Sequence, residues 1–285
     1  MWNSARHLLL WGMLVCLVAQ TLHATELRKR TAAAFDSYIA ASEMRMHAEL
    51  QNGPFLYIDG LPEESRREAH AQLRDGQILI KQLQAKRGGN PVKVPGGLIH
   101  DWIGVIFIPN VSLAQTVALA QDYDNYKVIY KPDVSQSRLV QRSGNDFKVF
   151  LQFYKKTMVT VVLNADYDIH YESVGADRMV SNSYSTRIVE LKDAGQANER
   201  ELPADGGHGY LWRLDSYWRL EAKDGGVYVQ LETIGLSRGV PAIFAWLVNP
   251  LLRSIPRGAL TNLLGATRRY LVAPGQSILN KTPSE

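Results

Sequence analysis

The segment of residues 210–236 constrains the fold of this chain more than any other. Two runs of alternating apolar and polar residues, 210–221 and 227–236, flank the dipeptide Asp224-Gly225. Asp-Gly is strongly favoured in a two-residue type I′ turn, so the runs are predicted to pair as an antiparallel β-hairpin. A slip of one residue would bury charged side chains, and the pairing register is therefore well specified.

The turn also predicts which residues of the hairpin lie opposite each other. Trp218 is expected opposite Leu231, on an apolar face, together with the pair Leu220 and Val229. The other face carries Arg219 with Gln230, Glu221 with Tyr228, and Tyr217 with Glu232. One face of the hairpin is thus predicted to be buried and the other to be polar.

Further strands precede the hairpin, because apolar residues alternate with polar ones in several short segments. In these segments one face is expected to be buried and the other wet, as in an antiparallel sheet. The predicted strands cover residues 99–108, 147–155, 159–171 and 179–191.

Helical periodicity marks both ends of the chain. Apolar residues recur at helical spacing in residues 35–50, and a second helical stretch, ending in a strand, is predicted within 61–86. A short helix within 112–121 is expected to be capped by Asn110 or Ser112. Near the C-terminus, a helix of residues 241–248 is predicted to break at Asn249-Pro250, before a longer helix that starts at Ser254.

This order of elements predicts an α+β fold in which a curved antiparallel sheet grips a long C-terminal helix. The chain of 285 residues suits one such domain with a short extension. Glycine-rich clusters at 88–97 mark the boundary between them. We predict a helical N-terminal extension at 25–93, the main domain at 94–273 and a flexible tail at 274–285.

The first residues have the outline of a secretory signal. Arg6 precedes an apolar run, 8–19, which is shorter than the ~20 residues that a spanning helix needs. We predict a signal peptide at 1–24, cleaved near Ala24, and a periplasmic or secreted protein. The formal net charge of +4 is small for this length, so nucleic-acid binding is not expected.

The main domain resembles the helix-grip superfamily, also called START-like or SRPBCC, which includes START lipid-transfer domains, polyketide cyclases and birch-pollen-allergen proteins. The likeness covers about 94–271 and rests on the element order and on the segments 212–221, 224–232, 236–238 and 254–257. These segments are similar to those of uncharacterised exported bacterial members. The resemblance implies a hydrophobic ligand, and it carries no catalytic residue that maps onto this sequence.

Two motifs suggest catalysis but lack partners. Residues 235–239 match the Gly-x-Ser-x-Gly pattern of a nucleophile elbow, yet no His or Asp follows Ser237. A strand-to-helix turn with a capping serine accounts for the pattern better. His100 and Asp101 are adjacent in one strand and point to opposite faces, so they cannot form a simple dyad. We predict no catalytic residue, and an enzyme is the less favoured interpretation.

Asp166, Asp168 and His170 share one face of a predicted strand and could offer ligands to a metal ion. The opposite face of the same strand is apolar, so a solvated outer surface explains the pattern better. We predict no metal site and no cofactor.

Nine residues are candidates for ligand contacts, either as apolar walls or as polar groups that orient a head group. Four residues of the hairpin's polar face, Arg213, Asp215, Tyr217 and Glu232, could alternatively form a solvated ladder of ion pairs. The nine candidates are Phe153, Leu163, Tyr167, Trp212, Arg213, Tyr217, Trp218, Leu231 and Glu232.

The sequence therefore predicts binding or transfer of an apolar small molecule or lipid in an internal cavity, outside the cytoplasm. Residues 244–248 beside Arg253 and Arg257 suggest transient contact with a membrane surface, although packing on the sheet is an alternative. Two other functions stay open. One is a cyclase or dehydratase in which His100 or Arg213 polarises a polyketide-like substrate. The other is a scaffold whose N-terminal helices bind a protein.

Overall fold

A computed structural model describes residues 29–156, 159–203, 207–239 and 242–273, without the side chains of Arg87 and of residues 242–254. The predicted signal peptide, its cleavage site and the tail at 274–285 lie outside the described residues. So do the side chains of the segment expected to touch a membrane surface. Within the described helices, none is both long enough and apolar enough to span a membrane.

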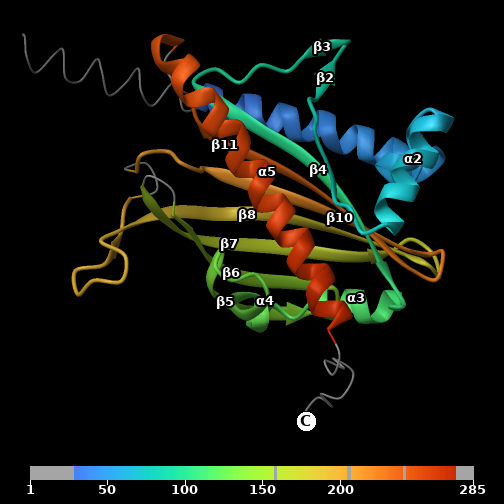
Figure 1. Ribbon diagram of the computed structural model, residues 1–285. Coiled ribbons are helices and arrows are strands. Elements are labelled where there is room, and N and C mark those ends of the chain that lie inside the picture. The colour runs from blue at the N-terminus through green and yellow to red at the C-terminus, as the bar shows by residue number, and fades with distance from the viewer. Residues whose placement is uncertain (1–28, 157–158, 204–206, 240–241, 274–285) are drawn as a thin grey trace, which may run out of the picture.

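One antiparallel sheet of nine strands organises the molecule (Figure 1). The order across the sheet is β1-β4-β11-β10-β8-β7-β6-β5, and β9 pairs with β8 at one end. A separate pair is formed by β2 (Lys86–Arg87) and β3 (Asn90–Pro91). The strands of the large sheet are β1 (Leu79–Gln82), β4 (Gly97–Pro109), β5 (Val134–Ser143), β6 (Asp146–Lys156), β7 (Thr160–Ser173), β8 (Arg178–Lys192), β9 (Arg200–Glu201), β10 (Arg213–Lys223) and β11 (Gly226–Arg238).

Helices cover both faces of the sheet. The long helix α5 (Ala242–Val272) runs diagonally across one face, called the inner face below (Figure 1). A helix of residues 29–52, called the N-terminal helix, packs on the other, outer face. The shorter helices are η1 (Tyr57–Gly60), α2 (Glu63–Arg74), α3 (Leu113–Ala120), η2 (Tyr123–Asn125) and α4 (Tyr126–Ile129).

The hairpin of β10 and β11 has the predicted turn and register. Asp224 and Gly225 both have positive φ, 56° and 75°, as a type I′ turn requires. Trp218 lies opposite Leu231, and Tyr217 lies opposite Glu232. The Asp-Gly signal therefore identified the pairing correctly.

The predicted class is confirmed: the fold is α+β, with a curved antiparallel sheet gripping a C-terminal helix. Ser112, one of the two expected caps, caps α3. Its side chain accepts a hydrogen bond from the backbone N–H of Gln115. The strand expected within 61–86 is β1, which pairs with β4. The N-terminal extension thus supplies an edge strand of the main sheet.

The predicted helix break at Asn249-Pro250 is wrong. The helix α5 is continuous over 31 residues, from Ala242 to Val272. The fixed φ of proline, about −65°, is itself helical, so an internal proline costs a hydrogen bond and a local clash without always ending the helix. Proline is a strong indication of a helix end, but not a certain one.

The apolar core is divided between the two faces. On the inner face, one cluster joins β4 and β11 to Leu260 and Leu264 of α5, and a second joins β5, β6 and β7 to α3 and α4. On the outer face, two further clusters lie under η1 and α2 and under the N-terminal helix. The sheet is therefore the middle layer of three.

Candidate functional site

On the central strand β10, charged side chains are buried, whereas two large apolar side chains are partly exposed. Asp215, Tyr217 and Arg219 point to the outer face and are at most 4% exposed. Leu214 and Trp218 point to the inner face, yet both are partly exposed. The N-terminal helix therefore seals the charged face, whereas the centre of the inner face is still accessible beneath α5.

The two inner-face clusters meet at this accessible region without merging. Leu220 on β10 belongs to the cluster of β4 and β11, and Ile169 on β7 belongs to the other cluster. Met179, Leu263 and Leu271 are only partly buried and pack against both. The core of the inner face is thus interrupted along β8 and β10.

Small hydroxyl side chains occupy this interruption. The register places Trp102 beside Thr233, Thr233 beside Ser216, and Ser216 beside Ser183, on four neighbouring strands. We call Ser183, Ser216 and Thr233 the hydroxyl row. Among the described residues, none hydrogen-bonds to these three hydroxyl groups. A serine or threonine side chain fills less volume here than a large apolar side chain would.

Two aromatic donors near the row are also without partners. Trp102 is 8% exposed and Tyr167 is 4% exposed. The indole Nε1 of Trp102 and the Oη of Tyr167 are buried and form no hydrogen bond within the described part of the chain. Burial raises the pKa of Tyr167, so its hydroxyl keeps its proton at neutral pH. A buried, unpaired donor costs about 1–3 kcal/mol, which a ligand oxygen or a water molecule could offset.

A histidine and a serine lie at one end of the same face. The Nε2 of His100 on β4 is 2.8 Å from the Oγ of Ser237 on β11. Burial lowers the pKa of His100 to about 4, so the imidazole is neutral at pH 7. The sequence analysis considered only partners that follow Ser237, and so it missed His100. His100 lies on β4, more than 100 residues before β11, and the two strands are neighbours only in the sheet. No described carboxylate hydrogen-bonds to this imidazole.

Asp101 points to the opposite side of β4, as predicted. Its carboxylate accepts a 2.7 Å hydrogen bond from the Tyr38 hydroxyl of the N-terminal helix. Burial and the nearby Glu232 raise the pKa of Asp101 to about 7. Burial likewise raises the pKa of Glu232, although Arg45 opposes the shift.

Four of the nine predicted ligand residues belong to the outer face. Glu232 accepts a 2.5 Å bond from Arg45, and Tyr217 donates a 2.9 Å bond to Glu43. The Arg213 guanidinium lies 5.5 Å from the centre of the Phe35 ring. Trp212 packs against the outer cluster under the N-terminal helix. These residues hold the helix in place and form neither a head-group site on the inner face nor a solvated ladder.

The other five predicted residues lie on the inner face. Phe153, Leu163 and Tyr167 belong to the cluster of β5, β6 and β7, whereas Trp218 and Leu231 belong to the cluster of β4 and β11. The hydroxyl row lies between these two groups. The sheet therefore divides the nine candidates and brings five of them to the two sides of one region.

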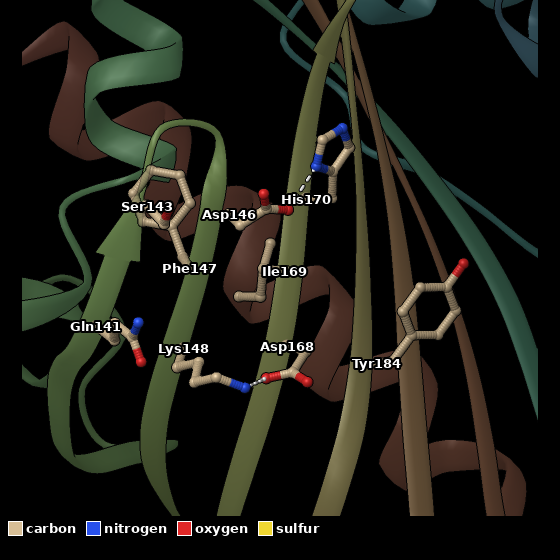
Figure 2. A pocket seen from close by; sticks show the side chains of 9 residues that line it. All are labelled: Gln141, Ser143, Asp146, Phe147, Lys148, Asp168, Ile169, His170 and Tyr184. Carbon is tan, nitrogen blue, oxygen red and sulfur yellow. Dashed lines mark hydrogen bonds and ion pairs between the residues drawn. The ribbon is translucent and has the colours of Figure 1, made fainter.

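A shallow pocket on the outer face of β6 and β7 is lined by Asp168 and His170, two of the three residues considered above as metal ligands (Figure 2). It encloses about 350 Å³. His170 pairs with Asp146 at 2.7 Å, and Asp168 pairs with Lys148 at 2.8 Å, as the dashed lines in Figure 2 show. Asp166 pairs with Arg187 instead. The described residues contain no group of three metal-ligating side chains, and these three residues form separate surface ion pairs.

An open groove of about 490 Å³ lies between the C-terminal ends of α2 and α5. Its floor includes Leu73, Phe107 and Val272. Its rim carries Arg74, Arg268 and Arg269, as well as Asp75. Arginines in the last turn of a helix also interact favourably with the helix dipole, which is a sufficient reason for Arg268 and Arg269.

No family model and no curated protein matches the sequence. Several solved structures are similar to it, at low identity. A STAR-related lipid transfer protein from Xanthomonas axonopodis is 18% identical, with a TM-score of 0.42 over 66% of this chain and 98% of the other. Human STARD10 is 10% identical, with a TM-score of 0.41 over 74% of this chain and 81% of the other.

The di-domain aromatase/cyclase StfQ from the steffimycin pathway is 11% identical, with a TM-score of 0.40 over 75% of this chain and 56% of the other. At such identities the likeness concerns the fold alone. These structural neighbours of the chain are START-like proteins at low identity.

Proposed function

We propose that this protein binds one hydrophobic, lipid-like molecule between the inner face of its sheet and α5, and holds or carries it outside the cytoplasm. The observation that supports the proposal is the interrupted core of the inner face. Leu214, Trp218 and Leu263 are partly exposed there, although they lie between two well-packed clusters. A bound apolar molecule would join the two clusters into one.

Burial of apolar surface would drive the binding. Each 100 Å² of apolar surface removed from water contributes about 2.5 kcal/mol. A ligand that covers the exposed parts of Leu214, Trp218 and Leu263 would gain on both its own surface and that of the protein. The small side chains of the hydroxyl row provide the space.

The first experiment is native mass spectrometry, with lipid extraction, of the protein purified from its own host. A stoichiometric co-purifying lipid would support the carrier function and identify the ligand class. An apo mass, together with no uptake of fluorescent fatty-acyl probes, would contradict it.

A space-filling variant tests the location of the ligand. Ser216→Leu places a larger side chain in the hydroxyl row and is expected to lower probe affinity at least tenfold. Ser65→Leu is the matched control, because Ser65 is exposed on α2. Circular dichroism of both variants checks that they fold. Unchanged binding by a folded Ser216→Leu variant would rule out this location.

The proposed location outside the cytoplasm follows from residues 1–24. Cell fractionation of the host is expected to recover the protein outside the cytoplasm, with its N-terminus near residue 25. Deletion of residues 1–24 is expected to retain it in the cytoplasm. Cytoplasmic recovery of the full-length chain would contradict export.

The bond between His100 and Ser237 favours a second candidate function, a catalysed step on the bound molecule. A neutral imidazole could accept the proton of the Ser237 hydroxyl, as a general base does. Arg213 cannot assist from the outer face. A fluorophosphonate probe is expected to label Ser237, and not a His100→Ala variant, if this pair is catalytic. No labelling would leave binding as the function.

A further inference from the structure

The hydroxyl row indicates which kind of hydrophobic molecule fits the inner face. We infer that the ligand is uncharged and carries a hydroxyl, ketone or ester oxygen along its length, which hydrogen-bonds to the hydroxyl row and to Trp102. This inference rests on the proposed binding function and specifies the chemistry of the same site. It is supported by the hydrogen-bonding groups of the row, by the lack of charged side chains on the inner face of β4, β11 and β10, and by the direction of the row across the sheet.

The hydrogen-bonding groups require a ligand with oxygen atoms. An indole N–H is a donor only, whereas a serine or threonine hydroxyl both donates and accepts. Trp102 therefore needs an acceptor, and Ser183, Ser216 and Thr233 can pair with either an acceptor or a hydroxyl. A pure hydrocarbon would leave the Trp102 donor buried and unpaired, at a cost of about 1–3 kcal/mol.

The charges around the row disfavour an anion. Of the described residues that alternate onto the inner face of β4, β11 and β10, none is Asp, Glu, Lys or Arg. The row thus offers no cation to pair with a carboxylate or phosphate. Burying an unpaired ionised group costs far more than burying a neutral polar group.

Three buried carboxyl groups lie behind this line of residues, on the outer face. Asp101 precedes Trp102, and in the hydroxyl row Asp215 precedes Ser216 and Glu232 precedes Thr233. Asp101, Asp215 and Glu232 are each at most 2% exposed. Arg45 and Arg219 compensate part of this acidity, but both lie on the far side of the sheet. Burial raises the pKa of all three carboxyls and so weakens their negative charge. The main cost for an anion on the row is therefore the lack of a cationic partner.

The direction of the row suggests how the ligand lies. Trp102, Thr233, Ser216 and Ser183 follow one another across four strands. With about 4.8 Å between neighbouring strands, the line from Trp102 to Ser183 is about 14 Å long. A ligand lying along it would run across the strands, with oxygen atoms in its interior as well as at an end.

Three probes that share one polyene chain test the inference: cis-parinaric acid, its methyl ester and the corresponding alcohol. Fluorescence titration at neutral pH of the protein purified from its host is expected to show the alcohol and the ester binding at least tenfold more tightly than the acid. Equal or tighter binding of the acid would overturn the inference. Failure of all three probes to bind would instead contradict the proposed binding function.

Variants of the row provide the second test. Ser216→Ala and Thr233→Val remove hydroxyls with little change in size, and each is expected to weaken alcohol binding about threefold to tenfold. Ser65→Ala, at an exposed position of α2, is the matched control and is expected to bind as the wild type does. If neither row variant reduces the preference for the alcohol over the acid, the row does not recognise the ligand.

Discussion

At the scale of single residues, β10 and β11 carry buried charged side chains on their outer face and small hydroxyl side chains on their inner face. Arg219 is only 4% exposed, and its guanidinium contacts Glu49 at 2.8 Å and the backbone oxygen of Phe55 at 2.7 Å. Such a buried ion pair contributes little net stability, because desolvation offsets the attraction, but loss of one partner is costly. The network therefore acts mainly to specify how the N-terminal helix sits on the sheet.

Asp101 makes the stability of the protein depend on pH. Its pKa is about 7 in the folded protein, whereas an unfolded aspartate has a pKa of about 3.9. Between these values the folded state binds more protons than the unfolded state, so the free energy of unfolding falls as pH rises from about 4 to about 7. Urea denaturation across this range is expected to show the fall.

Asp101→Asn is expected to weaken this dependence on pH, since the amide cannot ionise but can still accept the bond from Tyr38. Asp168→Asn serves as the control, because Asp168 is exposed and paired with Lys148. An unaltered pH profile in the Asp101→Asn variant would show that another group is responsible.

At the scale of elements, the N-terminal helix and α5 are held to the sheet in different ways. The N-terminal helix contributes fully buried aromatic residues, Phe35 and Tyr38, and several charged contacts. The described part of α5 buries Leu260, Leu264 and Ala266 in the inner-face clusters, whereas its Leu263 and Leu271 are only partly buried. The outer layer is therefore sealed, whereas the inner layer leaves part of the sheet accessible.

Truncation of Phe35 should show how strongly the N-terminal helix stabilises the fold. Phe35→Ala is expected to lower the free energy of unfolding by about 3–5 kcal/mol, because a fully buried phenylalanine leaves a cavity. Met44→Ala is the control, since Met44 is 68% exposed, and it should change stability little. Equal effects in urea denaturation would mean that the helix does not pack as described.

Close packing of α5 on β4 depends on Gly104. A Cβ at this position would lie 2.5 Å from Leu264 Cδ1 and 2.8 Å from Ile80 Cδ1. Gly104→Ala is expected to destabilise the protein by about 1–3 kcal/mol through overpacking.

Gly258→Ala is the matched control for Gly104, because nothing lies within 4 Å of a Cβ there. It should stabilise α5 by about 0.5–1 kcal/mol. Thermal denaturation of both variants would reveal the opposite signs. A stabilising Gly104→Ala would show that the helix sits further from the sheet.

At the scale of the whole molecule, three layers give the two faces of one sheet different roles. The outer face is closed by the N-terminal helix, η1 and α2, and the inner face is crossed by α5 (Figure 1). Ligand binding on the inner face would complete its core. Folding stability and ligand occupancy should therefore be linked.

A saturating neutral ligand is expected to raise the melting temperature. At a free ligand concentration of 100 times Kd, the added stability is about 2.7 kcal/mol. Differential scanning calorimetry with parinaryl alcohol would measure it, and the Ser216→Leu variant should show a much smaller rise. If the ligand binds but the melting temperature does not rise, the ligand does not prefer the folded state. Its site would then not be the one formed by the sheet and α5.

Local physics made several features readable from the sequence alone. A type I′ turn needs two residues with positive φ, so Asp224-Gly225 determined the hairpin and its register. Side chains alternate strictly along a strand, so the two faces of β7 and β10 could be separated. The cap at Ser112 is also local. In contrast, β5 was not recognised as a separate strand, because its exposed edge position, with only Val134 and Ser137 buried, gives no clear alternation.

Only the tertiary structure decided what covers each face. A polar strand face that meets solvent and one that meets a polar helix have the same sequence pattern, so Arg213, Tyr217 and Glu232 could not be assigned to the N-terminal helix beforehand. The pairing of His100 with Ser237, and the alignment of Ser183, Ser216 and Thr233, likewise arise from strand order, which brings together segments far apart in the chain. Alternation determined which residues share a face, and long-range packing determined which face stays open to a ligand.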